Sequence, residues 1–304
     1  FLNYLLRDKH YRHWVLSTST GTTVRHTSPR KIEEFKFFLP SIEEQTNIAE
    51  VLLSLDNKIE LNKIMNDTLE EIAKTLFKSW FIDFDPVRAK VEGRSTGLSK
   101  EISDLFPDSF EDSDLGEIPK GWKSGRFGDL VEPQRGKVIT KSMTTPGKIP
   151  VVAGGTKPPY FHNKSKTISP VVTISASGTA GYVNIYYEDI WASDCSYISN
   201  ETSKYVFFTY SYLKTNQDKV YNLRHGAVQQ HVYPKDLIEL EIIIPNISVL
   251  EEYENTVSIL HKKIKSNLDE GKILVNLRDI LLPKLFSGEL KIPDAEKLID
   301  EVNL

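Results

Sequence analysis

Cysteine is almost absent from this chain of 304 residues, in which Cys195 is the single example. One cysteine excludes an internal disulfide and a zinc site with several cysteine ligands, so a reducing cytoplasm is the expected compartment. No apolar run approaches the roughly 20 residues that a membrane span needs, and no secretory signal peptide is present. With 39% hydrophobic and 26% charged residues, we expect a soluble protein of about two domains.

The motifs of the common catalytic sites are missing too. The sequence has no Gly-rich loop for S-adenosylmethionine, no histidine pair on a helix for metal hydrolysis, no Walker loop and no nucleophile elbow. Residues 157–160 (KPPY) resemble the Asp/Asn-Pro-Pro-Tyr tetrapeptide of amino-methyltransferases. Lys157 cannot accept the hydrogen bond that the first residue of that tetrapeptide must accept. We therefore expect a non-catalytic chain without a cofactor or a metal.

The most regular stretch, residues 40–80, predicts one long helix. Ser41 can cap its free amides, and Glu44 can bond back to the cap. Apolar residues then recur at alternating spacings of four and three, which is the pattern of a heptad seam and requires a partner helix. The expected seam residues of this first helix are Leu52, Leu55, Ile59 and Asn62.

The partner helix is expected in the same chain, because the sequence repeats itself. Gly226, His231 and Pro245 follow Gly21, His26 and Pro40 by 205 residues each. A period of this length indicates a pseudo-dimer of two large units rather than a solenoid. The second helix then begins after Pro245, and its expected seam residues are Val257, Leu260, Ile264 and Asn267.

The two seam asparagines occupy equivalent positions of the repeat. In an antiparallel helix pair, equivalent positions meet only near the centre, where Asn62 lies. We therefore predict that Asn62 and Asn267 face each other and fix the register, as single buried asparagines do in coiled coils. Two exposed asparagines are the alternative.

The predicted fold class is α+β, with globular domains and two long helices packed as an antiparallel coiled coil. The first domain ends with a short strand at 34–40 (EFKFFLP), and the second is rich in short strand signals. If the second unit starts near Leu115, roughly ninety residues of the first unit would precede Phe1, so we interpret the chain as a fragment. The expected segments are 1–40 (end of a first domain), 41–85 (first helix), 86–115 (acidic linker), 116–245 (second domain), 246–286 (second helix) and 287–304 (tail).

The second domain carries a basic cluster that the overall charge conceals. Between residues 123 and 166, nine Lys or Arg stand against two acidic residues, although the net charge of the chain is −4. Cations interleaved with aromatic and amide side chains can neutralise phosphates and read base edges, although an ordinary lysine-rich surface would have a similar sequence. The candidate DNA-binding residues of this cluster are Arg135, Lys137, Lys157, Tyr160, His162 and Lys164.

A second cluster, residues 224–231 (RHGAVQQH), offers donors and acceptors suited to bases or phosphates. A polar turn is the alternative, but residues 21–26 (GTTVRH) match it in the first repeat and indicate a turn used twice. The candidate DNA-binding residues here are Arg224, Gln229, Gln230 and His231.

Several segments together resemble the specificity (S) subunits of type I restriction-modification systems. They are the duplicated domain-plus-helix plan, EIPKGWKSGRFGDL at 117–130, ISASGTAG at 174–181, WASD at 191–194, GAVQQHVYPKDL at 226–237 and LFKSWFIDFDPVRAK after the first helix. The resemblance covers nearly the whole chain. It implies two target-recognition domains that each read one half of a split DNA sequence, separated by two long antiparallel helices. A helix of about 40 residues spans roughly 60 Å, comparable to two turns of DNA at about 34 Å each.

The resemblance also implies partners and further site residues. The expected partners are double-stranded DNA, two modification subunits, which methylate adenine, and, through them, restriction subunits, which use ATP to translocate and cleave DNA. By position, Ser175, Ser177 and Gly178 match a turn that lies at or near the DNA in this family. The chain itself is expected to be non-catalytic.

Three other interpretations stay open at this point. Because only the last part of a first recognition domain is present, the chain can be a half-subunit that dimerises, or a degenerate one without independent DNA recognition. A coiled-coil scaffold would share the helices but has no need for basic loops. A DNA-methylating enzyme would need motifs that this sequence lacks.

Overall fold

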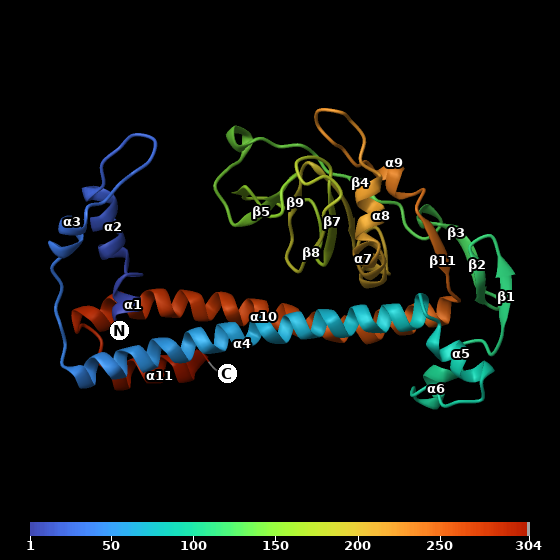
Figure 1. The fold of residues 1–304 in the computed structure, drawn as a ribbon, viewed down its shortest axis with the longest axis horizontal. Helices are drawn as coiled ribbons and strands as arrows, with labels where there is room; N and C mark the ends of the chain where they lie inside the picture. Colours follow the sequence, from blue (N-terminus) through green and yellow to red (C-terminus); the bar gives the residue numbers. More distant parts are fainter. Residues whose placement is uncertain (303–304) are drawn as a thin grey trace. The chain divides into compact units, whose positions relative to one another are not determined.

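The computed structural model describes residues 1–302 of the chain, which divides into two compact units. Unit 1 comprises Phe1–Thr68 and Lys263–Leu304, and unit 2 comprises Leu69–Lys262. Two long helices, α4 (Ile42–Phe81) and α10 (Ile247–Ser287), contribute residues to both units (Figure 1). The predicted fold class, α+β with two long antiparallel helices, is confirmed. None of the helices within residues 1–302 is long and apolar enough to cross a membrane.

Unit 1 is built on the first part of α4 and the last part of α10. Their apolar seam includes Leu52, Leu55 and Leu274, all buried. Arg278 of α10 binds Asp56 of α4 over 2.7 Å, and Asn267, earlier in α10, bonds Asn66, later in α4, so the helices run antiparallel. The other elements of this unit are α1 (Leu2–Leu5), α2 (Lys9–Thr18), α3 (Pro29–Glu33) and α11 (Ile292–Val302).

The start of α4 has the capping box that the sequence predicts. The backbone N–H of Glu44 donates to Oγ of Ser41 over 3.2 Å. The backbone N–H of Ser41 donates in turn to Oε2 of Glu44, also over 3.2 Å. Two of the free amides at this helix end are satisfied in this way, so the helix begins after Pro40 as expected.

Most of the expected seam residues are buried. Leu52, Leu55, Asn62, Val257, Ile264 and Asn267 are buried, and Ile59 and Leu260 are partly buried against the hydrophobic clusters. The hydrogen bonds of the asparagines differ from the expected pairing. Asn267 donates to Oδ1 of Asn66 over 2.8 Å, and Asn62 donates to Oε2 of Glu270 over 2.9 Å. The centre of the antiparallel pair therefore lies between Asn62 and Asn66 rather than at Asn62.

The strand predicted at residues 34–40 is not formed, and residues 35–40 belong to no helix or strand. The equivalent residues of the second repeat form β11 (Glu241–Ile244), which pairs with β3 (Lys123–Arg126). Residues 1–40 contain no counterpart of β3. Phe37 is 45% exposed, whereas its equivalent Ile242 is 4% exposed. Hydrophobic sequence alone predicts a strand here, but a strand also needs a pairing partner.

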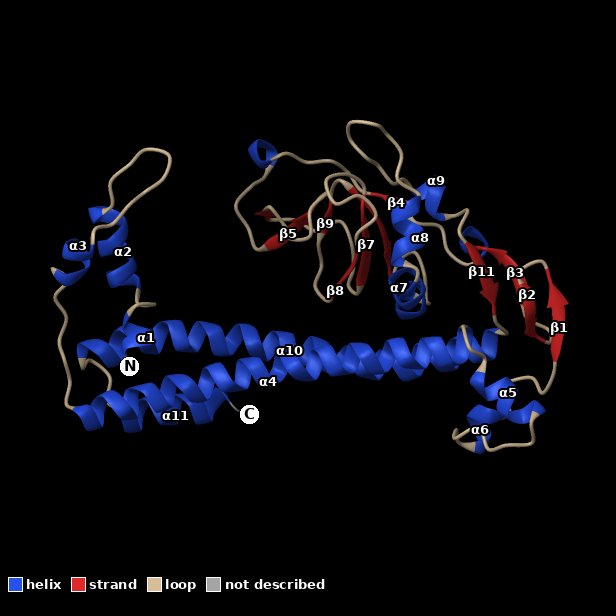
Figure 2. Cartoon of the chain, viewed as in Figure 1, coloured by secondary structure: helices blue, strands red, loops and turns tan. Residues whose placement is uncertain are grey.

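Unit 2 holds four small sheets and the helices that cover them (Figure 2). A four-stranded antiparallel sheet has the order β4-β10-β7-β8, with bounds Gln134–Arg135, Cys195–Ser199, Val171–Ser175 and Val183–Tyr186. A three-stranded sheet has the order β6-β5-β9, with bounds Tyr160–His162, Ile149–Val152 and Trp191–Ala192. The pairs β3-β11 and β1-β2 (Phe110–Ser113 and Gly116–Pro119) complete the set.

The helices of unit 2 are short apart from the portions of α4 and α10. Helix α7 (Val206–Thr215) packs against β7 and β8. Two helices and a strand also form in the segment 86–115, interpreted from sequence as an acidic linker, and Val87 and Phe106 there are buried. The bounds are α5 (Asp85–Val91), α6 (Lys100–Ser103), α7 (Val206–Thr215), α8 (Gln217–Asn222) and α9 (Pro234–Leu237), with single 3-10 turns at η1 (Phe127–Asp129) and η2 (Lys141–Met143).

Helix α10 holds α7 through two ionisable side chains, the half-buried Glu254 and the buried His261. The carboxylate of Glu254 accepts hydrogen bonds from the backbone N–H groups of Phe207 and Phe208, each over 2.9 Å, at the start of α7. His261 stacks on Phe207 with 4.3 Å between ring centroids, and its Nδ1 lies 2.6 Å from the Tyr187 hydroxyl. Burial raises the pKa of Glu254 to about 7 and lowers the pKa of His261 to about 4. Both contacts therefore orient α7, and the sheet on which it packs, relative to α10.

We expect the Asn66–Asn267 hydrogen bond to control the stability of the helix pair. Asn267→Ala should lower the free energy of unfolding by about 1–3 kcal/mol, because the amide of Asn66 is left buried without its partner. The double variant Asn66→Leu/Asn267→Leu should recover most of this loss, because it removes both polar groups.

Denaturant unfolding of the full chain, followed by circular dichroism, measures these differences. Asn57→Ala, at an exposed asparagine of α4, is the matched control and should be nearly neutral. A double variant as unstable as Asn267→Ala would contradict the prediction.

Candidate nucleic-acid interface

Segments that are far apart in the sequence meet at one end of the four-stranded sheet. The turn 175–181 connects β7 to β8, and Asp194 directly precedes β10. The backbone N–H of Ala176 donates to the carbonyl of Asp194, and the N–H of Val232 donates to the carbonyl of Ala176, each over 3.1 Å. We call this surface the sheet end; it comprises β4, the turn 175–181, residues 193–194 and residues 231–233.

Two glycines allow this close approach of backbone segments. A Cβ atom on Gly178 would lie 2.7 Å from the carbonyl oxygen of Gly154, and a Cβ on Gly154 would lie 2.5 Å from that of Ser177. Gly178 also has a φ of +62°, in the left-handed region that favours glycine. The N–H of Thr179 donates to Gly154 over 2.8 Å, which fixes the turn against the segment after β5.

Charged and aromatic side chains of the sheet end form one connected cluster. The guanidinium Nη2 of Arg135 lies 3.0 Å from Oδ1 of Asp194, and the Ser177 hydroxyl donates to the other oxygen of Asp194. The guanidinium carbon of Arg135 lies 5.2 Å from the ring centroid of Tyr233. The ring of His231 stacks on the ring of Tyr233, with 5.7 Å between the ring centroids and 7° between the ring planes. The cluster therefore links β4, β10, the turn and the loop before α9.

The loop 225–231 projects beyond this cluster as a closed turn. His225 and His231 exchange two backbone hydrogen bonds, of 3.0 and 2.8 Å. Gly226 has a φ of +107°, and a Cβ there would lie 2.3 Å from the carbonyl oxygen of Gln229. The tip, including Val228, Gln229 and Gln230, is exposed. Two amide side chains are thus presented to solvent on a backbone that is fixed at its base.

The same closed turn occurs in unit 1, where the repeat places it. Thr20 and His26 exchange backbone hydrogen bonds of 2.9 and 2.8 Å. Gly21 has a φ of +109°, and a Cβ there would lie 2.1 Å from the carbonyl oxygen of Val24. The two loops differ in their tip residues but share the glycine conformation and the closing pair. The turn interpreted from sequence as a device used twice is therefore built alike in both repeats.

The structure separates the candidate DNA-binding residues into three groups. The sheet end and its loop bring together Arg135, Ser175, Ser177, Gly178, Gln229, Gln230 and His231. Arg224 flanks them, with its Nε donating to the carbonyl of Ala180 over 2.7 Å. Lys137, Lys157 and Lys164 are exposed on loops next to the sheets.

Tyr160 and His162 form the third group, inside the three-stranded sheet. The Tyr160 hydroxyl donates to the carbonyl of Ile139 over 2.5 Å. His162 is 7% exposed, its Nδ1 accepts from the N–H of Thr145, and its ring packs edge-on against Trp191. These contacts support a packing role, and Ser175, 4% exposed and bonded to the carbonyl of Gly155, has one as well.

Sequence reasoning missed Asp194 and Tyr233, which hold Arg135 in place. Asp194 is the last residue of the WASD segment, and Tyr233 lies in the HVYP segment after the loop. Both segments stood out as motifs, but Asp194 is acidic and Tyr233 lies outside the basic cluster, so neither was selected as a DNA contact. Their role follows from contacts of Arg135 with residues 59 and 98 positions later in the chain, which the sequence pattern does not reveal.

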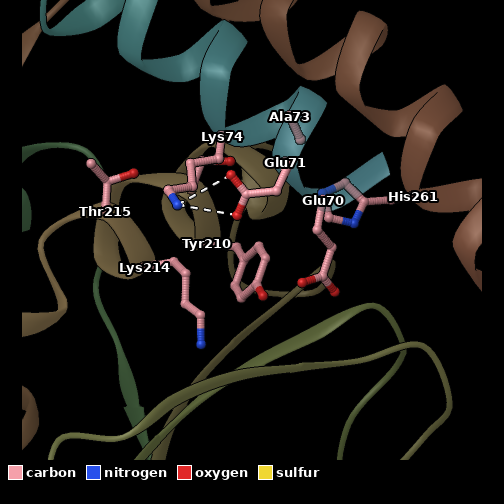
Figure 3. Close-up of a pocket in the computed structure, with 9 residues that line it drawn as sticks. Glu70, Glu71, Ala73, Lys74, Tyr210, Lys214, Thr215 and His261 are labelled. Atoms are coloured by element: carbon pink, nitrogen blue, oxygen red, sulfur yellow. Dashed lines mark hydrogen bonds and ion pairs between the residues drawn. The ribbon is translucent and has the colours of Figure 1, made fainter. Parts of the chain in front are cut away.

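Unit 2 also contains a pocket and a buried thiol outside the sheet end. A pocket of about 160 Å³ lies among α4, α7 and α10, where Lys74 pairs with Glu71 and His261 lines the wall (Figure 3). Burial raises the pKa of the Cys195 thiol to about 12, which makes it a poor nucleophile. Among residues 1–302, His, Cys, Asp and Glu side chains form no cluster of three that could hold a metal ion.

Comparison with known proteins assigns this architecture to a family. The model of the type I restriction modification DNA specificity domain matches residues 1–71 and 119–275. The chain is similar to the type I restriction enzyme HindI specificity subunit of Haemophilus influenzae, at 27% identity over 91% of this chain and 73% of that protein. It is also 27% identical to the MjaIX specificity subunit of Methanocaldococcus jannaschii, over 97% of this chain and 69% of that protein.

A solved structure supports the fold. The crystal structure of a type I restriction-modification system S subunit from M. genitalium superimposes with a TM-score of 0.56 and 17% sequence identity, over 93% of this chain and 71% of that chain. The identity is low, so this likeness concerns the fold alone.

We expect Gly226→Ala to deform the closed loop, because the added Cβ would collide with the carbonyl of Gln229 and the backbone has a positive φ. If the loop contacts nucleic acid, duplex DNA binding should weaken by about tenfold, corresponding to about 1.4 kcal/mol. Fluorescence anisotropy with a labelled duplex pool measures this change.

Gly93→Ala is the matched control, because Gly93 also has a positive φ but has no atom near its Cβ position. It should show the backbone strain alone, without loss of DNA affinity. Equal affinities for Gly226→Ala and Gly93→Ala would show that the loop does not contribute to binding.

Proposed function

Because this chain belongs to the family of type I restriction modification DNA specificity domains, we propose that unit 2 reads DNA sequence through its sheet end. The protein provides DNA target specificity within a type I restriction-modification system and, as a member of this family, is non-catalytic itself. We propose the cytoplasm as its compartment, because the DNA that it would bind lies there. The convergence of Arg135, the turn 175–181 and the loop 225–231 on one surface is the observation that supports the proposal most strongly.

The chemistry of this surface suits a duplex. Exposed lysines such as Lys137 and Lys157 can neutralise phosphates without reading sequence. Amide side chains at 229 and 230 and the guanidinium of Arg135 can form paired hydrogen bonds with base edges in the major groove. Fixed backbones at Gly178 and Gly226 lower the entropy lost when these groups bind. The surface therefore combines lysines that bind the phosphate backbone with side chains that can distinguish the bases.

The partners of the chain are proposed to be two modification subunits and, through them, restriction subunits. Helix α4 carries a second apolar stripe on the side away from its seam, formed by Leu53, Leu61 and Ile64, each about half exposed. Their spacing of eight and three keeps them on one face of a helix. Exposed apolar stripes of this kind are typical docking faces for a partner helix. We assign this stripe to a modification subunit.

A scaffold without a DNA role explains these observations less well. Packing of a coiled coil requires neither the duplicated loop with its strained glycine nor an arginine held by a carboxylate and an aromatic ring. A scaffold also predicts DNA retention that is weak and insensitive to salt, whereas a surface with several phosphate contacts loses affinity steeply as salt rises.

Methylation mapping tests the proposed function. The full chain is expressed with its neighbouring modification subunit in a host that lacks DNA methylation, and N6-methyladenine is mapped across the genome by long-read sequencing. We expect methylation confined to one gapped motif. A palindromic motif means that two copies supply two identical readers, and an asymmetric motif means that a different recognition domain participates. Absence of any motif, with failure of the two proteins to copurify, would contradict the proposal.

The docking stripe is tested in the same expression system. Leu61→Glu/Ile64→Glu should abolish copurification of the modification subunit, because burying two carboxylates in an apolar interface costs several kcal/mol and each 1.4 kcal/mol is tenfold in affinity. Lys63→Glu, also exposed on α4 but outside the stripe, is the control and should copurify normally. Retention of the modification subunit by the double variant would place its binding site elsewhere.

A further inference from the structure

Arg135 lies at a position where a side chain can be fixed and exposed at once. It is in β4, the edge strand of the four-stranded sheet, and pairs with Ser196 of β10. This pairing places it beside Asp194, the residue before β10. Its side chain is 37% exposed, so it is accessible to a ligand without being free to move as a surface arginine does.

The guanidinium is held from two directions. At its edge, Nη2 is hydrogen-bonded to Asp194 over 3.0 Å. At its face, it lies over the ring of Tyr233, 5.2 Å from the centroid. Asp194 is held in turn by the Ser177 hydroxyl, and Tyr233 by stacking with His231. The plane of the guanidinium is therefore set before any ligand arrives.

The bonding capacity of this group is only partly used. A guanidinium has five N–H donors in a rigid fork. Within the part of the chain that the structure describes, Arg135 donates one side-chain hydrogen bond, the one to Asp194. Both oxygens of Asp194 are already engaged, by Arg135 and Ser177, so the carboxylate acts as a support rather than as an acceptor for a base. The other four N–H donors make no side-chain hydrogen bond within residues 1–302, and the side chain as a whole is 37% exposed.

The chemistry of a fixed, planar fork favours a base over a phosphate. Two parallel N–H donors match O6 and N7 of guanine in the major groove, which is the commonest specific contact of arginine with DNA. Phosphate needs only a positive charge, and the flexible Lys137 and Lys141 beside β4 already supply it. The carboxylate of Asp194 and the ring of Tyr233 fix the orientation of the guanidinium. Paired hydrogen bonds to a base edge require a fixed orientation, whereas a phosphate contact does not.

We propose that Arg135 reads a guanine in the half-site recognised by unit 2, with Asp194 and Tyr233 as its positioning residues. This inference rests on the proposed function and names the base and the residue within it. It makes Arg135 a determinant of specificity and leaves the bulk of the affinity to the surrounding lysines and the closed loop.

The test compares the sequence preference of variant complexes. The full chain is purified with its modification subunit, and bound duplexes are selected from a random pool and sequenced. For Arg135→Ala, we expect preference for guanine at one position of the motif to fall by about tenfold or more, with the other positions unchanged. Arg135→Lys should give a similar loss, because a single ammonium lacks the fork. Lys141→Ala removes a proposed phosphate contact and is the comparison, because it should weaken binding equally for all sequences and keep the motif.

The positioning residues give a second readout. Asp194→Asn keeps the shape of the side chain but removes its charge, and it should relax preference at the same position as Arg135→Ala. Tyr233→Leu removes the ring under the guanidinium and should relax preference at the same position, and Tyr233→Phe, which restores the ring, should recover it. Relaxation at one shared position is not expected from a general loss of stability, which lowers the melting temperature and the bound fraction without altering the motif.

The outcomes separate the proposals. An unchanged motif in Arg135→Ala, with binding weakened equally for all sequences, would overturn the guanine assignment in favour of a phosphate contact. An unchanged motif with only a lower melting temperature would overturn it in favour of a structural ion pair. A wild-type complex that selects no motif would overturn the proposed function itself.

Discussion

The packing of aromatic rings around Tyr253 is the interaction on which unit 2 depends. Tyr253 belongs to α10, is fully buried, and lies 5.0 to 5.9 Å from the rings of Phe77, Trp80, Phe81 and Phe208. Its hydroxyl lies 2.9 Å from Oγ of Ser211 in α7 and 3.3 Å from the carbonyl oxygen of Ala73 in α4. One side chain therefore joins both long helices to the helix that covers the sheet. Large aromatic side chains bury much apolar area and pack in edge-to-face pairs, so this cluster resists displacement of any one of the three helices.

Above this aromatic cluster, the backbone and the side chains of the sheet end have different roles. Glycines that permit close backbone contacts, at positions 154, 178 and 226, hold the framework of the sheet end and its loop. The side chains above that framework, such as Arg135 on an edge strand, can change without affecting the core. The closed loop occurs in both repeats with the same glycine conformation and different tip residues. A duplicated backbone shape with variable side chains is what a pair of readers for different half-sites would need.

Much of the fold could be predicted from the sequence where the signal was local. The capping box at Ser41, the seam at Leu52 and Leu55, and the presence of a second helix as partner follow from spacing and repetition, whereas the antiparallel direction was implied by the family resemblance. The partner of Asn267 could not be predicted, because an antiparallel centre shifted by two residues selects Asn66. The prediction of a strand at 34–40 was wrong for a related reason. A strand forms only where a neighbouring strand pairs with it, and the hydrophobicity of the segment does not show whether such a partner exists. At the site, Arg135 was identified by its charge, whereas Asp194 and Tyr233 became visible only through contacts between distant segments.

The aromatic contact between Phe81 and Tyr253 has a consequence for how such proteins change over generations. Phe81 is the last residue of α4 and Tyr253 lies near the start of α10, and their ring centroids are 5.0 Å apart. All of the chain between the two helices therefore leaves and re-enters the helix pair at neighbouring points. A segment attached in this way can be exchanged for another of different length or sequence while the helices keep their seam. Gene recombination at the helix ends would then replace the whole segment in one step and leave the contacts of the helix seam in place.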